Sequence, residues 1–299
     1  MYDLIVIGGG PAGLTATVYA LRKRLNVLLL TRDLGGKTNY RLQLPFVEHH
    51  LVITGEETVS RFANEVQYLE FARAFTRVER VEQIPGGYRV QTQAGASHDA
   101  RALVIATGAL GRLLNVPGER EFMMRGLCYS AVSYAPLFIE RDTAVIGDTA
   151  LALRSAAELA RTARHVTLIA PTRGELDSAL GARVLAAANV EVLEGFRVEQ
   201  IVGDQYARAV VVARDGERRE VQADGFFVEL ELLPQSELVA HLVERDAAGR
   251  IRVDSRNRTS APGIFAAGDV TDVFAEQVLI AIGEGAKAAL AAYEYLLTQ

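Results

Sequence analysis

The sequence contains a single cysteine, Cys128, among its 299 residues. A disulfide framework, a cysteine-ligated zinc cluster and a dithiol–disulfide couple each need at least two cysteines, so none of them can form within this chain. A lone cysteine is most often a small buried hydrophobic residue, and we favour that role for Cys128 over a reactive one.

Long apolar runs are also absent. No stretch approaches the roughly 18 apolar residues of a membrane-spanning helix, and Met1-Tyr-Asp3 lacks the basic start of a signal peptide. The 32 basic residues are outnumbered by 37 acidic ones, which argues against nucleic acid or an anionic membrane as a partner. We expect a cytoplasmic protein that binds neither and holds no metal, with the pair His49-His50 as polar surface.

A glycine-rich turn stands near the start of the chain. The apolar strand Leu4 to Ile7 runs into Gly8-x-Gly10-x-x-Gly13, and an Ala-rich helical stretch, Leu14 to Arg24, follows. In a dinucleotide-binding turn the first glycine allows a tight bend, the second admits a pyrophosphate and the third lets helix and strand pack closely. The helix N-terminus then presents N–H groups to the phosphates.

The strand after this helix, Asn26 to Leu30, ends without the acidic residue that usually bonds the adenosine ribose in such folds. Thr31 stands there, with Asp33 two residues on. A threonine hydroxyl gives a weaker hydrogen bond than a carboxylate. We expect Thr31 to take this place.

The pattern restarts in the middle of the chain. After a boundary near Val116 to Glu119, a strand at Thr143 to Ile146 leads into the turn Gly147 to Ala152 and a helix to Arg161. Two strand–turn–helix–strand units indicate two dinucleotide-type halves, and 299 residues suit two domains. Further strands are expected at Val166 to Ile169, Phe75 to Ile84, Tyr88 to Gln93, Leu103 to Ile105, Val190 to Leu193, Val198 to Val202, Ala209 to Ala213, Gly225 to Leu230 and Ile264 to Ala266, and helices at Val59 to Phe71 and Glu276 to Leu297.

Several motifs in this order resemble the low-molecular-weight thioredoxin reductases and, more broadly, the pyridine-nucleotide flavoprotein reductases. The motifs are Ile7-Gly-Gly-Gly-Pro-Ala-Gly13, Leu103-Val-Ile-Ala-Thr-Gly108, Val145-Ile-Gly147, Thr259-Ser-Ala-Pro-Gly-Ile-Phe-Ala-Ala-Gly-Asp-Val270 and Ala281-Ile-Gly-Glu-Gly-Ala-Lys-Ala-Ala-Leu290. The resemblance implies an α/β fold of two Rossmann-like, three-layer ββα domains, the second inserted in the first. An FAD domain would comprise residues 1–115 and 245–299, and an NAD(P)H-binding-like domain residues 116–244.

The resemblance also implies which residues hold FAD. Gly8 to Gly13 would meet the pyrophosphate, Asp269 the ribityl–phosphate part, Val78 the adenine, and the N–H groups of Gln277 and Val278 the flavin O2 edge. A helix N-terminus at that edge would stabilise the anionic reduced flavin. The turn Ala106-Thr107-Gly108 is open to two interpretations, a cofactor contact or an ordinary tight turn. The full predicted set is Gly8, Gly10, Pro11, Ala12, Gly13, Thr31, Arg32, Gly36, Lys37, Val78, Ala106, Thr107, Gly108, Gly268, Asp269, Gln277 and Val278.

The chain departs from the family at its redox dithiol. Where those enzymes carry Cys-x-x-Cys, this chain has Ser130 and Ser133, and Cys128 is offset by two residues. A hydroxyl cannot form a disulfide or act as a soft nucleophile. We therefore expect no thioredoxin reductase mechanism.

The nicotinamide half departs too. The family's Gly-x-Gly-x-x-Ala is here Gly147-Asp-Thr149-Ala-Leu-Ala152, which places a negative charge and a β-branched side chain beside the pyrophosphate position. The cluster that binds the 2′-phosphate of NADPH is replaced by Ala170-Pro-Thr172, with Arg173 next. We expect NADH or NADPH binding to be weak or lost.

Lys37 replaces the family's glutamine after Gly35-Gly36. A positive charge near the flavin would raise its reduction potential, a hypothesis that a redox titration of the Lys37→Gln variant tests.

Two functions remain open. The first is a diaphorase-like oxidoreductase that passes electrons from NAD(P)H through FAD to a non-dithiol acceptor such as ferredoxin, a quinone, oxygen or a dye. The second is a flavoprotein with an altered nicotinamide site, serving as a redox sensor or holding another nucleotide in its second pocket. The resemblance implies a homodimer, because members of that family usually form dimers.

Overall fold

The computed structural model describes residues 1–47 and 55–299, so the pair His49-His50 lies outside the described residues. The chain forms two compact units. The first contains residues 1–39, 55–110 and 233–299, and the second contains residues 40–47 and 111–232.

These bounds correct the boundaries expected at residues 115 and 244. Leu42 and Leu44 are buried in the core of the second unit, so this early segment packs with the middle of the chain. Val239 and Val243 are buried in the core of the first unit, which therefore begins again at residue 233. Burial of these apolar side chains decides to which unit each segment belongs.

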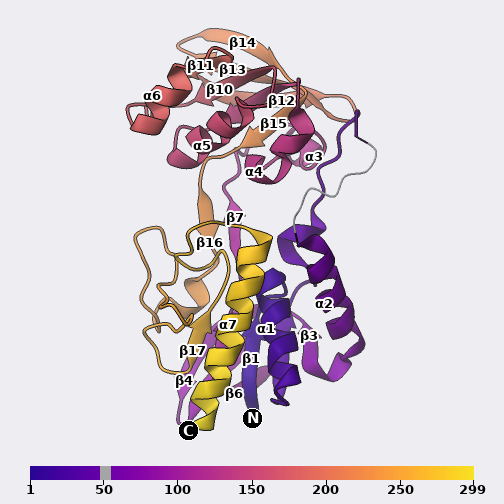
Figure 1. The fold of residues 1–299 in the computed structure, drawn as a ribbon, viewed down its shortest axis with the longest axis vertical. Helices are drawn as coiled ribbons and strands as arrows, with labels where there is room; N and C mark the ends of the chain where they lie inside the picture. Colours follow the sequence, from indigo (N-terminus) through magenta and orange to yellow (C-terminus); the bar gives the residue numbers. More distant parts are fainter. Residues whose placement is uncertain (48–54) are drawn as a thin grey trace. The chain divides into compact units, whose positions relative to one another are not determined.

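The first unit is built on one sheet with the strand order β3-β2-β1-β6-β5-β4. Figure 1 labels β1, β3, β4, β6 and β17 of this unit. Strand β17 also pairs with the end of β6, and β4, β5 and β6 are antiparallel neighbours, whereas the other pairs are parallel. The strands are β1 (Tyr2–Ile7), β2 (Val27–Thr31), β3 (Arg73–Phe75), β4 (Val78–Ile84), β5 (Gly87–Thr92), β6 (Ser97–Ile105) and β17 (Ile264–Ala266).

One expected strand is in fact two. The run Phe75 to Ile84 divides at Thr76 and Arg77, because β3 pairs with β2 whereas β4 pairs with β5. A hairpin turn at Pro85 and Gly86 joins β4 to β5, with Ile84 opposite Gly87 in antiparallel register.

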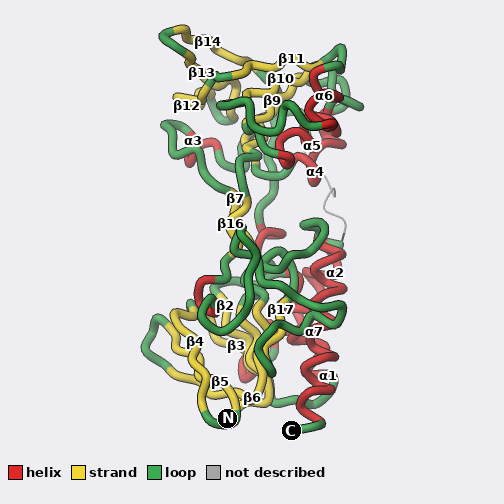
Figure 2. Tube along the Cα trace, turned by 90° about the vertical axis from the view of Figure 1, so that its left-hand side faces the viewer, coloured by secondary structure: helices red, strands yellow, loops and turns green. Residues whose placement is uncertain are grey.

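Alternate residues of the strands face opposite sides of the first sheet, as the two-residue period of a strand requires. Leu4 and Val6 lie in a core with the helices, whereas Ile5 and Ile7 lie in a second core with β4 and β5. Figure 2 shows the helices together on one side of the sheet. They are α1 (Pro11–Arg22), α2 (Glu56–Tyr68) and α7 (Val278–Leu297), and the short 3-10 turns of the unit are η1 (Gly36–Asn39), η2 (Glu70–Ala72) and η4 (Glu237–Val239).

The second unit has a parallel sheet of order β11-β10-β9-β15-β8 and a separate antiparallel sheet, β12-β13-β14. Figure 2 shows α4, α5 and α6 on one side of the parallel sheet and the antiparallel sheet on the other. The strands are β8 (Leu127–Cys128), β9 (Asp142–Ile146), β10 (His165–Ala170), β11 (Val190–Glu194), β12 (Arg197–Gly203), β13 (Ala207–Arg214), β14 (Glu217–Gln222) and β15 (Gly225–Val228). The helices are α3 (Glu119–Phe122), α4 (Ala131–Tyr134), α5 (Ala150–Leu159) and α6 (Ala179–Leu185), with the 3-10 turn η3 (Ala135–Phe138).

Both units therefore have three layers, a helical layer, a parallel sheet and an antiparallel layer, and the expected two-domain Rossmann-like fold is confirmed. Strands β7 (Ala109–Gly111) and β16 (Leu232–Pro234) pair where the chain passes from one unit to the other. Among the described residues no helix is long and apolar enough to cross a membrane.

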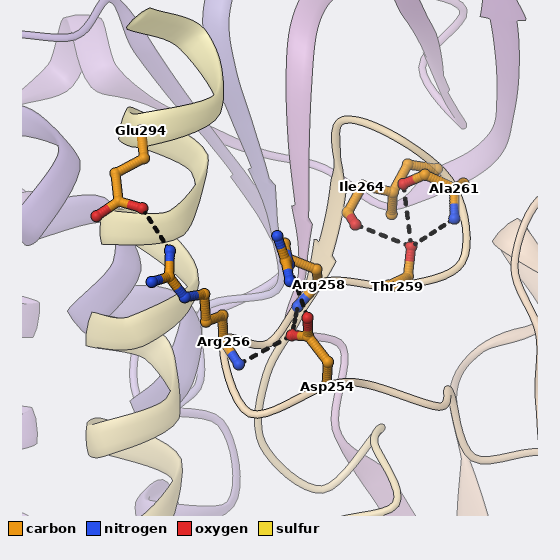
Figure 3. A network of polar contacts seen from close by, with 7 residues as sticks. All are labelled: Asp254, Arg256, Arg258, Thr259, Ala261, Ile264 and Glu294. Atoms are coloured by element: carbon orange, nitrogen blue, oxygen red, sulfur yellow. Dashed lines mark hydrogen bonds and ion pairs between the residues drawn. The ribbon is translucent and has the colours of Figure 1, made fainter. Parts of the chain in front are cut away.

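The loop before β17 is held by a polar network (Figure 3). The Asp254 carboxylate accepts hydrogen bonds from the backbone N–H groups of Arg256 and Arg258, at 2.8 and 3.0 Å. Arg256 also pairs with Glu294 of α7 at 2.8 Å, which fastens the loop to that helix. This loop leads directly into β17 and the turn Gly268-Asp269.

Candidate functional site

The glycine turn of the first unit has the close packing that the sequence predicts. Gly8 has a φ of +110°, and a Cβ atom there would lie 2.3 Å from the carbonyl oxygen of Ala106. A Cβ at Gly13 would lie 1.8 Å from the carbonyl oxygen of Gly8. Neither position can hold a side chain, because real Cβ atoms do not approach other atoms so closely. Gly10 instead faces open space, with nothing within 4 Å of its Cβ position.

Helix α1 begins at this turn. Gly10 is its N-cap residue and Pro11 its first residue, so no side chain of the N-cap can accept from the N–H groups of the first turn. Those N–H groups and the positive end of the helix dipole form a site for an anion. Together with the open space at Gly10, this end of α1 fits the pyrophosphate of a dinucleotide such as FAD.

Three other predicted segments meet this turn. A Cβ at Gly36 would lie 3.0 Å from the Cα of Gly10, and a Cβ at Gly268 would lie 3.0 Å from the Cβ of Ala12. The third segment includes Thr107, whose backbone nitrogen would lie 3.0 Å from a Cβ at Gly8. The structure thus brings together the four segments Gly8 to Gly13, Gly36-Lys37, Ala106 to Gly108 and Gly268-Asp269. Lys37 and Asp269 form an ion pair across them, with Nζ and Oδ2 2.7 Å apart.

Thr31 is placed at the end of β2 beside Gly9, but its hydroxyl donates to the carbonyl oxygen of Asp33 at 2.7 Å. Its hydrogen is therefore used inside the loop, and its contact with a ribose stays a prediction. The Asp33 carboxylate accepts from the N–H of Gly36 at 2.8 Å and so shapes the loop that carries Lys37. Arg32 is exposed.

The remaining predicted residues lie at element ends. Gln277 is the N-cap of α7 and Val278 its first residue, and the side chain of Gln277 makes no capping hydrogen bond, so this helix end is also open to an acceptor. Val78 begins β4, opposite Thr92. The contacts of these residues with flavin and adenine stay predictions.

The turn of the second unit repeats the backbone of the first. Gly147 has a φ of +148°, and a Cβ there would lie 2.4 Å from the carbonyl oxygen of Glu229. Glu229 therefore stands where the first unit has Ala106. Its buried carboxylate accepts from the N–H of Ala131 at 2.7 Å and from the Ser155 hydroxyl at 3.0 Å.

The loop after β10 is fastened to this turn. Thr172 donates its N–H and its hydroxyl to Asp148 at 2.9 and 2.6 Å, and Glu175 donates its N–H to the Asp148 carbonyl oxygen at 2.8 Å. Arg173, the one cation expected near a 2′-phosphate, pairs with Asp177 and Glu194. Asp148 and Arg173 thus both make polar contacts with other residues of the second unit.

The two serines of the expected dithiol position lie together. The hydroxyl oxygens of Ser130 and Ser133 are 3.0 Å apart, at the start of α4. Cys128 is buried in β8, and burial raises the pKa of its thiol far above the usual range. A buried protonated thiol is a poor nucleophile, in keeping with the structural role expected for it.

Two residues that contact the glycine turns or the start of α4 were not predicted from the sequence. Glu284 of α7 accepts the N–H of Gly268 at 2.8 Å, and burial raises the pKa of its carboxyl. Glu284 lies in the segment 281–290, one of the motifs that resemble the family, but the sequence alone predicted no contact for it. Glu229 had a clearer signal, because a charged residue directly after the apolar run Gly225 to Val228 stands inside an expected strand. No group of three metal-ligating side chains occurs in the described residues.

Two units, each with a strand–glycine turn–helix element, and a helix end open to a pyrophosphate in the first of them, indicate the class of a two-domain dinucleotide-binding oxidoreductase. Comparison with known proteins agrees: residues 2–285 match the family of pyridine nucleotide-disulphide oxidoreductases. The chain belongs to this family, in its thioredoxin reductase-like branch. The relationship supports FAD as a cofactor and an oxidoreductase function in general.

Individual relatives give the same result. The chain is 33% identical to an alkyl hydroperoxide reductase component of Staphylococcus aureus and 32% identical to that of Staphylococcus epidermidis, over 99% of this chain. It spans only 59% of the length of these relatives. Its structure is similar to that of thioredoxin reductase from Streptococcus pyogenes, with a TM-score of 0.87, 30% identity and coverage of 100% of this chain and 99% of the other. Thioredoxin reductase from Giardia duodenalis also gives a TM-score of 0.87, with 26% identity and 99% of both chains covered.

Proposed function

We propose that this protein is an FAD-containing oxidoreductase without a redox dithiol, which passes electrons from NAD(P)H through FAD to a non-dithiol acceptor. The observation that carries the proposal is the serine pair. Ser130 and Ser133 place two hydroxyl groups 3.0 Å apart at the position where the resemblance implies a dithiol. The chain's single thiol, on Cys128, is buried. Electrons that reach the flavin must then leave it directly.

The residues of the first unit would hold the cofactor. The N–H groups at the start of α1 would bind the pyrophosphate, Asp269 the ribityl–phosphate part, and the open start of α7 at Gln277 the O2 edge of the ring. Bound FAD supplies the redox chemistry, accepting an electron pair from a donor and passing it on. The protein's own contribution is to bind and orient it.

The lack of a dithiol limits the class of electron acceptor to those that react with reduced flavin directly. A ferredoxin, a quinone, oxygen or a dye can each take electrons from reduced flavin without thiol exchange, which makes the activity diaphorase-like. We further propose that the protein acts in the cytoplasm and as a homodimer, as is usual in the family.

A second candidate is a flavoprotein with an altered nicotinamide site, serving as a redox sensor or holding another nucleotide. One observation favours it: Asp148 already holds Thr172 through two hydrogen bonds, and Arg173 is already paired with two carboxylates. A dinucleotide entering this unit would meet a carboxylate at its phosphate position, with Arg173 beside it already engaged.

Anaerobic mixing of the FAD-loaded protein with NADH or NADPH separates the two candidates, with the flavin absorbance as the readout. Rapid bleaching by either donor, followed by recovery on adding a dye or quinone, supports the first. No bleaching at millimolar donor overturns it and supports the second. Free FAD under the same conditions is the control, because it reports any reduction that does not need the protein.

A further inference from the structure

Asn257 has a buried side-chain oxygen without a donor. Within the described residues its Oδ1 is the one buried side-chain nitrogen or oxygen that makes no hydrogen bond. The residue is fully buried in the loop before β17, with a φ of +60°. Its Nδ2 donates to the carbonyl oxygen of Ala266 at 2.9 Å, which fixes the orientation of the amide, because the flipped amide would place two acceptors together. A buried acceptor without a donor costs free energy, so we looked for a group that supplies a proton.

Glu284 of α7 lies beside this amide. Its Oε2 accepts the N–H of Gly268 at 2.8 Å, and its carboxyl also interacts with the side chains of Asn257 and Thr271. Burial raises the pKa of the carboxyl, and the Gly268 N–H, the Lys287 ammonium and these two side chains offset this effect only in part. The carboxyl therefore keeps a proton more readily than an exposed glutamate, and a protonated carboxyl has an O–H group to donate.

Glu284 also lies where α7 packs against the start of α1. A Cβ at the next residue, Gly285, would lie 2.1 Å from the carbonyl oxygen of Ala12, in the first turn of α1. Asp269, in the turn that Glu284 holds, is already paired with Lys37, with 2.7 Å between Oδ2 and Nζ. An ionised Glu284 would add a second negative charge close to the helix end that is open to an anion.

We propose that Glu284 and Asn257 form a buried acid–amide pair, which holds one proton and positions the turn Gly268-Asp269 for FAD. The O–H of Glu284 donates to Asn257 Oδ1, while Oε2 keeps the N–H of Gly268. The proposal rests on FAD binding in the first unit, as in the proposed function. A neutral Glu284 tolerates the phosphates of FAD and an ionised one repels them, so the bound cofactor and the bound proton stabilise each other. Glu284 is thus a positioning residue whose protonation sets FAD affinity.

FAD affinity measured against pH tests this coupling. Apoprotein is titrated with FAD by flavin fluorescence for the wild type, for Glu284→Gln and for the control Glu294→Gln, whose glutamate is exposed on the same helix. Bound FAD favours the protonated carboxyl. Wild-type affinity is therefore expected to fall about tenfold relative to Glu284→Gln as the pH rises through the titration of Glu284, which corresponds to a change of about one unit in the pKa of this carboxyl on binding. Glu294→Gln is expected to follow the wild type.

Infrared spectroscopy of the apoprotein detects the pair without the cofactor, because a protonated carboxyl has a C=O band separate from that of carboxylates. At about pH 6 an ordinary glutamate, with a pKa of about 4.3, is ionised. The difference spectrum of wild type and Glu284→Gln is expected to show one protonated-carboxyl band at this pH. Asn257→Gly keeps the left-handed backbone and removes the amide, so it is expected to weaken this band and to move the pH dependence of FAD affinity to lower pH.

The outcomes separate the proposal from its alternatives. The same pH dependence of FAD affinity in wild type and Glu284→Gln, or a difference spectrum without the band, overturns it. A loss of affinity in Glu284→Gln that is constant with pH also overturns it, since the carboxyl would then act only through its hydrogen bond with Gly268. If Asn257→Gly does not fold, the comparison of wild type with Glu284→Gln decides alone. Failure of NAD(P)H to reduce the flavin would overturn the proposed function alone, because neither experiment needs an electron donor.

Discussion

Thr172 donates both its backbone N–H and its hydroxyl to the same carboxylate oxygen of Asp148, at 2.9 and 2.6 Å. Asp148 follows the glycine of the second turn, and Thr172 lies in the loop after β10, where dinucleotide folds place the residues that select the ribose or its phosphate. The turn and the selecting loop are thus bonded to each other.

We expect the Asp148→Ala variant to loosen this loop and to bind NADPH more tightly. Removing the carboxylate frees the two Thr172 donors and ends the repulsion of a phosphate. Amide exchange at residues 172–176 is expected to become about tenfold faster, equivalent to about 1.4 kcal/mol of local opening, and NADPH affinity to rise by a similar factor.

The control for this variant is Asp204→Ala, which removes another loop carboxylate of the same unit. It is expected to change neither quantity. Unchanged exchange and unchanged NADPH affinity in Asp148→Ala would show that Asp148 does not hold the loop.

The serine pair leads to a prediction of its own. The hydroxyl oxygens of Ser130 and Ser133 lie 3.0 Å apart at the i, i+3 spacing of a Cys-x-x-Cys motif. The double variant Ser130→Cys/Ser133→Cys is therefore expected to form a disulfide. Intact mass after thiol blocking, with and without prior reduction, detects it, and the single variants are the controls. Two freely alkylated thiols in the unreduced double variant would contradict the placement of these side chains.

Cys128 is expected to be unreactive in the folded protein. Burial raises the pKa of its thiol above the usual value, so the reactive thiolate is scarce at neutral pH. A thiol-reactive disulfide reagent should label it much more slowly in the native protein than after unfolding in guanidinium, because the fold both excludes the reagent and disfavours the thiolate. Native labelling at the rate of an unfolded thiol would refute this.

Glu284 gives a prediction on pH. Burial raises the pKa of its carboxyl, so between its ordinary pKa and the raised one the folded chain keeps a proton that the unfolded chain has released. The free energy of unfolding therefore falls as the pH rises through this interval. Glu284→Gln does not titrate, so wild type is expected to lose stability relative to this variant as the pH rises.

The matched control is Glu294→Gln, on the same helix but exposed and paired with Arg256. This variant reports how far removing any carboxylate of this helix changes stability. A constant difference between wild type and Glu284→Gln at all pH values would show that this carboxyl is not perturbed.

Glu284→Ala, which leaves the N–H of Gly268 without an acceptor, should lower the free energy of unfolding by about 1–3 kcal/mol.

The glycine turns were predictable from sequence because their geometry admits almost no other residue. Gly8 and Gly147 have positive φ values, and each packs against a carbonyl oxygen at the end of a neighbouring strand. A pattern of residue types can encode such local requirements. Most strand positions were also predictable, because strands coincide with apolar runs. Strand β14 was not predicted, since its residues are mostly charged and exposed.

The polar contacts between distant segments were not predictable in the same way. The bonds Lys37–Asp269 and Asp148–Thr172 join segments far apart in sequence, and a charged surface residue carries no periodic signal of its partner. The unit boundaries were missed for a similar reason. Leu42 and Leu44 are an ordinary short apolar pair, and only the packed core shows which unit buries them.

We propose that the flavin is the protein's one redox centre. Anaerobic titration of the FAD-loaded protein with dithionite counts the electrons it takes up. We predict one pair of electrons per flavin, with the flavin absorbance falling linearly from the first addition. Uptake of a second pair per flavin would reveal another redox group and contradict the proposal of a single redox centre.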